Sequence, residues 1–99
     1  MNDSEPDSPS QEPVPIPITG ELDLHCFQPS EIKELLPAYL EECLVLGFRE
    51  VRVIHGKGTG ALRETVHSLL RKDLQVLSFR LGNESEGSWG ATMVCLKTP

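Results

Sequence analysis

Ile54-His55-Gly56-Lys57-Gly58-Thr59-Gly60-Ala61-Leu62-Arg63 is the segment of this chain that says most about its fold. It continues an apolar run that starts at Val51, and the apolar residues after it take the spacing of a helix. This pattern predicts a strand, a tight glycine loop and a helix. In α/β sheets, such a loop at the carboxyl end of a strand presents free backbone N–H groups that bind anions. We therefore predict a phosphate site, with His55 and Lys57 beside it.

Two common glycine motifs do not fit this loop. A P-loop places four residues between its first glycine and a Gly-Lys-Ser/Thr sequence, whereas Lys57 directly follows Gly56. Gly56, Gly58 and Ala61 fit the relaxed dinucleotide fingerprint, but the acidic residue expected about 20 positions later is missing. We therefore predict no bound dinucleotide and no other cofactor.

The composition limits the size and the class of the protein. The chain has 99 residues and a formal charge of −6, which suits one domain with a modest core. Five of the 15 acidic residues lie within residues 1–21, which contain no Lys or Arg. The acidic balance argues against strong non-specific binding to nucleic acid, because such binding depends on neutralising several phosphates. A local basic site is compatible with this charge.

Residues 1–20 are rich in Ser, Asp, Glu and Pro. Because proline removes backbone donors and interrupts helices, we predict a disordered acidic, Pro-rich arm before a folded domain at 21–99.

The three cysteines form no C-x-x-C pair, and the chain does not open with a basic region followed by an apolar run. No window approaches the roughly 20 apolar residues of a membrane helix. We expect a reduced, cytoplasmic and monomeric protein without a membrane span.

Hydrophobic spacing predicts the remaining elements of the domain. In chain order they are a strand at 21–26, a helix from the N-cap Ser30 to Gly47, a strand at 50–54, a helix at about 60–72, and strands at 76–81 and 91–97. The order β-α-β-α-β-β predicts a two-layer α/β domain with a four-stranded mixed sheet. The first two strands should be parallel, because a helix joins them.

Three motifs in this order resemble the small MutS-related (Smr) domain family, and in particular a stand-alone Smr domain protein. They are Leu22-Asp23-Leu24-His25, His55-Gly56-Lys57-Gly58-Thr59-Gly60 and Gly87-Ser88-Trp89-Gly90-Ala91-Thr92. The resemblance covers about residues 20–97. It implies a fold similar to the C-terminal domain of a translation initiation factor, and endonuclease or nicking activity on nucleic acid. In the family the activity is carried by the positions that are Asp23, His25, His55, Gly56 and Gly58 here.

The chain departs from the family pattern at two places. Cys26 stands where the family usually has glycine, and Gly87-Ser88 stands where it usually has two adjacent glycines. We expect the side chain at position 26 to narrow the cleft. This departure favours an alternative in which the domain binds nucleic acid with weak catalysis or none.

Phosphodiester cleavage needs a base, an acid, and positive charge or N–H donors for the anionic transition state. His25 and His55 are the predicted acid and base, since histidine titrates near neutral pH. From its place on the strand, Asp23 is expected to orient His55 across the sheet rather than His25. The phosphate and the nucleic acid should contact Gly56, Lys57, Gly58, Thr59, Gly60, Arg63 and Trp89.

Some roles are left open by the sequence. Trp89 is either a lid over the sheet or a platform on which bases stack. No residues have convincing metal-ligand spacing, so we predict no protein-bound metal and leave open a divalent ion bound with the substrate. His67 is interpreted as structural, Cys43 and Cys95 as core residues, and Cys26 as a small packing residue without a third group to activate its thiol.

The sequence therefore predicts an Smr-type nuclease that cleaves phosphodiester bonds in DNA or RNA by histidine-assisted chemistry. The first alternative is a nucleic-acid-binding module of the same fold, and a weaker one is a protein-interaction adaptor that uses the acidic arm. Nothing in the sequence distinguishes DNA from RNA.

Overall fold

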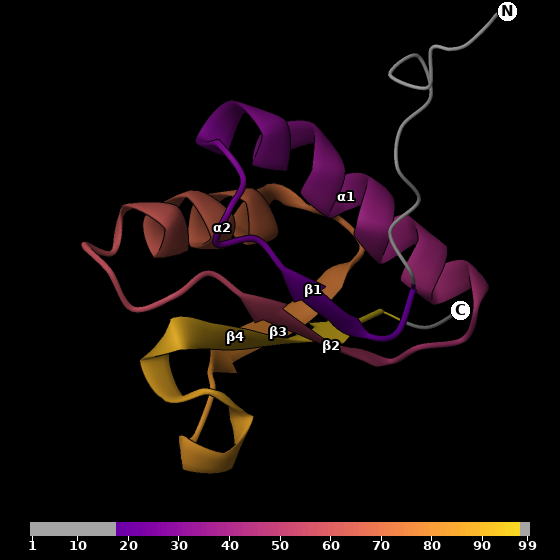
Figure 1. Cartoon of the computed structure of the whole chain (residues 1–99). Coiled ribbons are helices and arrows are strands. Elements are labelled where there is room, and N and C mark those ends of the chain that lie inside the picture. The colour runs from indigo at the N-terminus through magenta and orange to yellow at the C-terminus, as the bar shows by residue number, and fades with distance from the viewer. Residues whose placement is uncertain (1–17, 98–99) are drawn as a thin grey trace, which may run out of the picture.

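The chain alternates strands and helices in the predicted order (Figure 1). A computed structural model describes residues 18–97, so most of the predicted arm lies outside the described residues. The elements are β1 (Glu21–Asp23), α1 (Pro29–Val45), β2 (Glu50–Ile54), α2 (Ala61–Lys72), β3 (Val76–Leu81), the 3₁₀ turns η2 (Glu84–Glu86) and η3 (Ser88–Gly90), and β4 (Ala91–Leu96). The 3₁₀ turns were not predicted. The second helix begins one residue later, and the last strand ends one residue earlier, than predicted.

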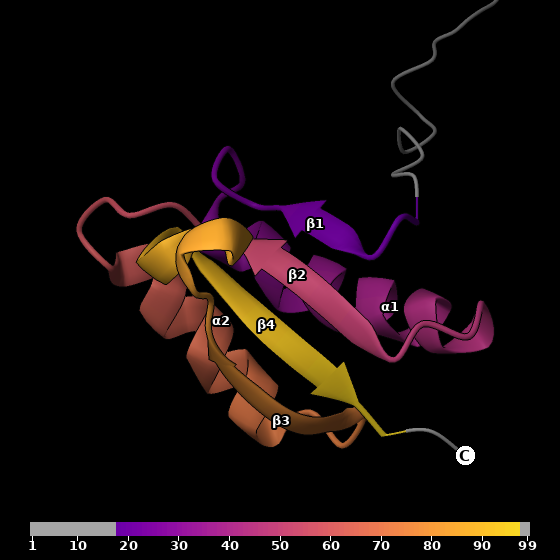
Figure 2. The same cartoon turned by 90° about the horizontal axis from the view of Figure 1, so that it is seen from below.

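The four strands form one mixed sheet in the order β1-β2-β4-β3, which confirms the predicted fold class. β1 and β2 are parallel, and β4 is antiparallel to both of its neighbours. Both helices cover the same face of the sheet, as Figures 1 and 2 show from two directions. Because parallel strands end at the same edge, the sheet brings the end of β1 beside the glycine loop that follows β2.

The core lies between the two helices and the inner face of the sheet. In β2, Val51 and Val53 are buried while Glu50 is exposed, as alternation along a strand requires. The largest fully buried side chains outside β2 include Leu22, Leu24, Ile32, Leu36, Leu40, Val66, Leu70 and Val94. Cys43 is buried as predicted, but Cys95 is only partly buried, which corrects its assignment to the core.

The turn after β1 differs from the prediction, which continued this strand to Cys26. β1 ends at Asp23, although the N–H of Leu24 still donates to a carbonyl of β2 at 2.7 Å. The chain then reverses, and the N–H of Phe27 donates to the Leu24 carbonyl at 3.0 Å. His25 therefore lies on a turn beyond the sheet rather than on the strand.

The first helix begins earlier than predicted and ends at Val45, two residues before the predicted Gly47. Its N-cap is Gln28 rather than Ser30, because the Glu31 carboxylate accepts the backbone N–H of Gln28 at 2.7 Å. Pro29 then takes the first turn, where its missing N–H costs nothing. Gly47 follows the helix with a φ of +91°, the left-handed conformation that ends helices. No helix within residues 18–97 has the length and apolar content needed to cross a membrane.

Candidate active site

The structure brings the β1 turn and the glycine loop to one edge of the sheet. Asp23 pairs with Ile54 in the parallel register, and a Cβ atom placed on Gly56 would lie 3.8 Å from the Cβ of His25. A cavity of about 360 Å³ opens between the two segments. Its lining consists of His25, His55, Gly56, Gly58, Thr59, Gly60, Leu62 and Arg63. The predicted site residues therefore converge, with Asp23, Lys57 and Trp89 just outside this lining.

The glycine loop is anchored to the segment that precedes β4. The carbonyl of Gly90 accepts backbone N–H groups from both His55, at 3.0 Å, and Gly56, at 2.9 Å. Gly56 and Gly60 have φ values of +83° and +90°, which side chains rarely tolerate. Because the backbone N–H of Gly56 donates to Gly90, it is not free to bind an anion. Among residues 18–97, the amides of 57–60 have no hydrogen-bond partner, and these are the N–H groups that an anion can reach.

Asp23 contacts His25 and not His55, which corrects the predicted pairing. The Oδ1 atom of Asp23 lies 2.5 Å from Nδ1 of His25 and accepts the backbone N–H of His25 at 3.1 Å. Partial burial acts to raise the pKa of Asp23, but the hydrogen bonds from His25 outweigh it and lower the pKa below 3.8. Asp23 is therefore ionised at neutral pH and accepts the Nδ1–H of His25. Nε2 of His25 is left as the nitrogen that can exchange a proton.

The thiol of Cys26 contacts Nε2 of His25. Its Sγ atom lies 3.2 Å from Nε2 of His25, and its side chain is exposed. The interpretation of Cys26 as a packing residue without a third activating group is therefore wrong, since Asp23 holds the opposite nitrogen of the same ring. A thiol hydrogen bonded to Nε2 competes with any substrate proton for that atom.

His55 is in a very different environment from His25. Only 4% of His55 is exposed, whereas 58% of the His25 side chain is. Nδ1 of His55 lies 3.1 Å from the carbonyl of Gly56, and Nε2 lies 2.8 Å from Oγ1 of Thr92. Burial lowers the pKa of His55 below 6.5, the Gly56 carbonyl opposes this shift, and the charge of Arg63 adds to it. His55 is therefore neutral at pH 7 and hydrogen bonded at both nitrogens.

Trp89 projects from the segment that anchors the glycine loop. Its side chain is 58% exposed, which does not fit a lid packed over the sheet. The Nζ atom of Lys57 lies 5.8 Å from the centroid of the Trp89 ring, within the range of a cation–π contact. This exposed ring beside a lysine has the form of a stacking platform.

An ion pair and a hydrogen bond to a carbonyl, which together we call the Glu86 clamp, hold this segment against the outer face of the sheet. The Glu86 carboxylate accepts two hydrogen bonds from the Arg80 guanidinium, at 2.7 and 3.0 Å. The Glu86 carbonyl accepts one from Arg52 at 3.1 Å. The hydrogen bonds from Arg80 lower the pKa of Glu86 to about 2. Sequence reasoning missed this clamp, although Glu86 three residues after Asn83 has the spacing of a capping box.

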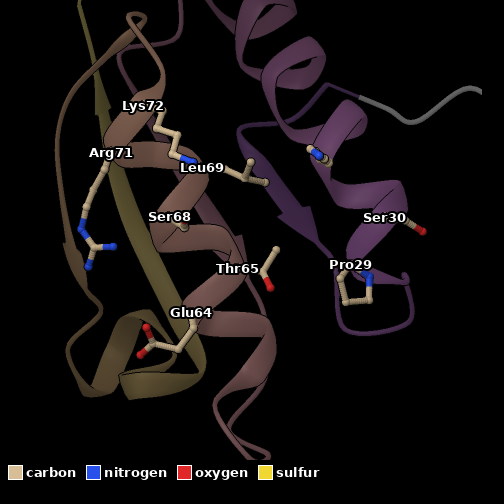
Figure 3. A pocket seen from close by; sticks show the side chains of 9 residues that line it. Pro29, Ser30, Glu64, Thr65, Ser68, Leu69, Arg71 and Lys72 are labelled. Atoms are coloured by element: carbon tan, nitrogen blue, oxygen red, sulfur yellow. The ribbon is translucent and has the colours of Figure 1, made fainter.

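A second cavity, larger than the one at the site, lies in the groove between α1 and α2. The groove has a volume of about 750 Å³. In Figure 3, Leu69 and Thr65 of α2 lie on the side that faces Pro29 of α1. None of the predicted site residues lines it. Within residues 18–97, no three His, Cys, Asp or Glu side chains are placed to hold a metal ion together.

The fold is a small mixed sheet, and its glycine loop faces a turn that holds an Asp–His pair. These two features are those of a small α/β domain of the Smr class. Residues 22–97 match the Smr domain family, and the chain belongs to this family. The resemblance seen in the three sequence motifs is thereby confirmed.

Relatives and solved structures agree with this assignment. Endonuclease MutS2 of Halothermothrix orenii is 40% identical over 81 residues, which cover 82% of this chain and 10% of that protein. Endonuclease MutS2 of Symbiobacterium thermophilum is 43% identical over 80 residues, 81% of this chain and 10% of that protein. This chain therefore spans about a tenth of the length of these relatives.

Two crystal structures share the fold. The Smr domain of Thermus thermophilus MutS2 is 40% identical, with a TM-score of 0.74 over 78% of this chain and 96% of that one. YdaL, a stand-alone small MutS-related protein from Escherichia coli, is 25% identical, with a TM-score of 0.75 over 80% of this chain and 65% of that one.

Proposed function

We propose that this domain is an endonuclease that cleaves phosphodiester bonds in DNA or RNA. The observation that carries the proposal is the Asp23–His25 pair, whose Oδ1 and Nδ1 atoms lie 2.5 Å apart beside the glycine loop. An ionised carboxylate that holds one imidazole nitrogen leaves the other as a general base, and this arrangement recurs in hydrolytic sites. The name Endonuclease MutS2, borne by relatives that match one domain, supports the same activity.

In the proposed reaction, Nε2 of His25 removes the proton from the attacking oxygen, which bonds to phosphorus as the bond between phosphorus and the leaving oxygen breaks. The leaving oxygen takes a proton from solvent water. The phosphate lies in the cavity and accepts hydrogen bonds from the backbone N–H groups of 57–60, while Arg63 supplies fixed positive charge. The negative charge that develops on the phosphate is thereby stabilised where water is partly excluded. A divalent ion carried by the substrate is compatible with these roles and is tested by a chelator.

The nucleic acid would extend from this cavity over the neighbouring surface. Lys57 stands in the chain between Gly56 and Gly58, which line the cavity, and its Nζ atom lies 5.8 Å from the Trp89 ring, so it is placed to contact a flanking phosphate. An exposed aromatic ring stacks on any base, so contact with Trp89 would be tolerant of sequence. These contacts suit a single strand or an unpaired end, where a base is free to stack.

The experiment compares nicking of supercoiled plasmid with cleavage of a labelled RNA by the purified protein, with and without chelator. His25→Gln serves as the control against a contaminating nuclease. Cleavage that persists in the His25→Gln protein would contradict the proposed mechanism. Cleavage by the parent and not by His25→Gln would support it, and the two substrates would decide between DNA and RNA.

A second candidate function is a nucleic-acid-binding module without cleavage. The observation that favours it is the 3.2 Å contact between Sγ of Cys26 and Nε2 of His25, because it occupies the proposed base. Oligonucleotide binding by the parent, with no cleavage by either the parent or Cys26→Gly, would identify this function.

A further inference from the structure

The hydroxyl of Thr92 is shared between two histidines. Its Oγ1 atom lies 2.8 Å from Nε2 of His55 and 2.7 Å from Nε2 of His67. Thr92 is fully buried, and the two imidazole rings meet edge to face with centroids 5.9 Å apart. Thr92 comes from β4, His55 directly follows β2, and His67 comes from α2. The network therefore forms only where these segments pack together.

The partners determine which atoms carry protons. Nδ1 of His55 faces the carbonyl of Gly56 at 3.1 Å, and a carbonyl only accepts, so Nδ1 carries the hydrogen. Burial lowers the pKa of both histidines, so at neutral pH each ring has a single N–H. Nε2 of His55 is then an acceptor, and the one proton of the Thr92 hydroxyl must be donated to it. Oγ1 of Thr92 in turn accepts the Nε2–H of His67.

The charged groups around the network support two neutral rings. The charges of Arg63 and Arg71, both on α2, act to lower the pKa of His67 in addition to burial. Glu64 acts in the opposite direction but contributes less than burial. On the sheet side, the ring of His67 packs against Phe79 with centroids 4.9 Å apart, an apolar neighbour that adds to the desolvation.

We propose that Thr92 and His67 are positioning residues that hold His55 as the Nδ1–H tautomer, so that His55 offers the phosphate a hydrogen-bond donor and not a base. This inference rests on the proposed function and deepens it, because it gives the two histidines different tasks. Nε2 of His55 is enclosed by Thr92 and is closed to substrate. Nδ1 lies on the side of Gly56, which lines the cavity, so a phosphate oxygen can replace the Gly56 carbonyl as acceptor.

Nitrogen-15 NMR of the histidine rings at pH 7.5 tests this assignment without any activity measurement. The parent should show a protonated Nδ1 and an unprotonated Nε2 for His55, the reverse of the tautomer that free histidine prefers. Thr92→Ser keeps the hydroxyl and should keep this pattern. Thr92→Val removes the hydroxyl with little change of shape and should shift His55 to the Nε2–H form or to a mixture. A parent spectrum with Nε2 protonated would overturn the proposal, even if Thr92→Val fails to fold.

A second pair of variants tests His67. The amide of Gln places a donor near the position of Nε2, so His67→Gln should preserve the His55 tautomer. His67→Leu removes the donor and should reduce the population of the Nδ1–H form. Identical His55 spectra in His67→Leu, His67→Gln and the parent would remove His67 from the network's function.

Titration with inorganic phosphate measures the consequence for binding. Loss of one hydrogen bond to a charged group weakens affinity about tenfold or more, so Thr92→Val should bind phosphate that much less tightly than Thr92→Ser. Equal affinities would contradict the donor role. Failure of the two proposals is distinguishable: the expected tautomer without nuclease activity would refute only the proposed function, and the opposite tautomer would refute only this inference.

Discussion

The Oδ1 atom of Asp23 lies 2.5 Å from Nδ1 of His25, across a turn that also ties the His25 backbone N–H to the same oxygen. This double contact holds an exposed imidazole in one orientation at the rim of the cavity. The other histidine of the site, His55, is buried and hydrogen bonded at both nitrogens. The exposed ring of His25 can therefore exchange a proton with a substrate through Nε2, whereas Nε2 of His55 is enclosed by Thr92.

The first prediction concerns the Asp23–His25 pair. His25→Gln should lower kcat by about 10²- to 10⁴-fold, the usual contribution of a general acid or base. Asp23→Asn keeps an oxygen for Nδ1–H but loses the charge, so its kcat should lie between those of the parent and His25→Gln. Both variants should bind a non-cleavable oligonucleotide like the parent, because the base acts in the transition state. Asp73→Asn makes the same change in a distant turn and should leave kcat unchanged; an unchanged kcat in Asp23→Asn as well would exclude Asp23.

The second prediction concerns Cys26, whose Sγ atom lies 3.2 Å from the proposed base. Cys26→Gly and Cys26→Ala both free Nε2 of His25, so both should cleave as fast as the parent or faster. Cys95→Ala, which removes a thiol from β4, is the matched control. Loss of cleavage in both position-26 variants, with none in Cys95→Ala, would show that the thiol itself takes part.

The third prediction separates charge from stacking beside the cavity. Lys57→Ala should weaken oligonucleotide binding and reduce the slope of log K against log salt by about one, because one phosphate contact is lost. Trp89→Ala should cost roughly 1–3 kcal/mol for a stacked base and leave the salt slope nearly unchanged. Fluorescence anisotropy at several salt concentrations measures both effects. If the distant Lys97→Ala weakened binding as much as Lys57→Ala, the contact would not be specific.

The fourth prediction uses the chain's single tryptophan, Trp89, to follow the Glu86 clamp. The pKa of Glu86 is lowered from 4.5 to about 2, so the carboxylate contributes to the clamp above 4.5 and loses this contribution as the pH falls toward 2. Trp89 fluorescence in the parent should therefore hold nearly constant down to pH 4 and change below it. In Arg80→Gln the change should move up toward the ordinary carboxylate range. Identical pH profiles would show that the clamp does not position Trp89.

The fifth prediction is the pH dependence of stability from the buried histidines. The pKa values of His55 and His67 are lowered from 6.5, so below 6.5 the unfolded chain binds protons that the folded chain does not. The free energy of unfolding should be at its highest above pH 7. It should fall as the pH drops below 6.5 toward the lowered pKa values of the two histidines in the folded chain. Melting temperatures between pH 8 and pH 5 measure this fall. It should be smaller in His67→Gln, and an equally steep fall in that variant would exclude His67 as a source.

Much of the domain was determined by the sequence alone, because it depends on local patterns. Apolar spacing specified the order of strands and helices, and the glycines at 56, 58 and 60 specified the loop between β2 and α2. The meeting of the His25 segment with that loop also followed, since two parallel strands joined by a helix end at the same edge of a sheet.

Which side chains touch depends on the three-dimensional packing of the domain. Spacing within β1 suggested that Asp23 would reach His55, but the strand ends at Asp23 and the turn brings His25 back onto the carboxylate. Likewise, Thr92 and His67 lie 25 residues apart, and the sequence predicts only that one is in a strand and the other in a helix. Their contact depends on strand register and on how α2 sits on the sheet. These are set by packing of the whole core, which no local spacing encodes.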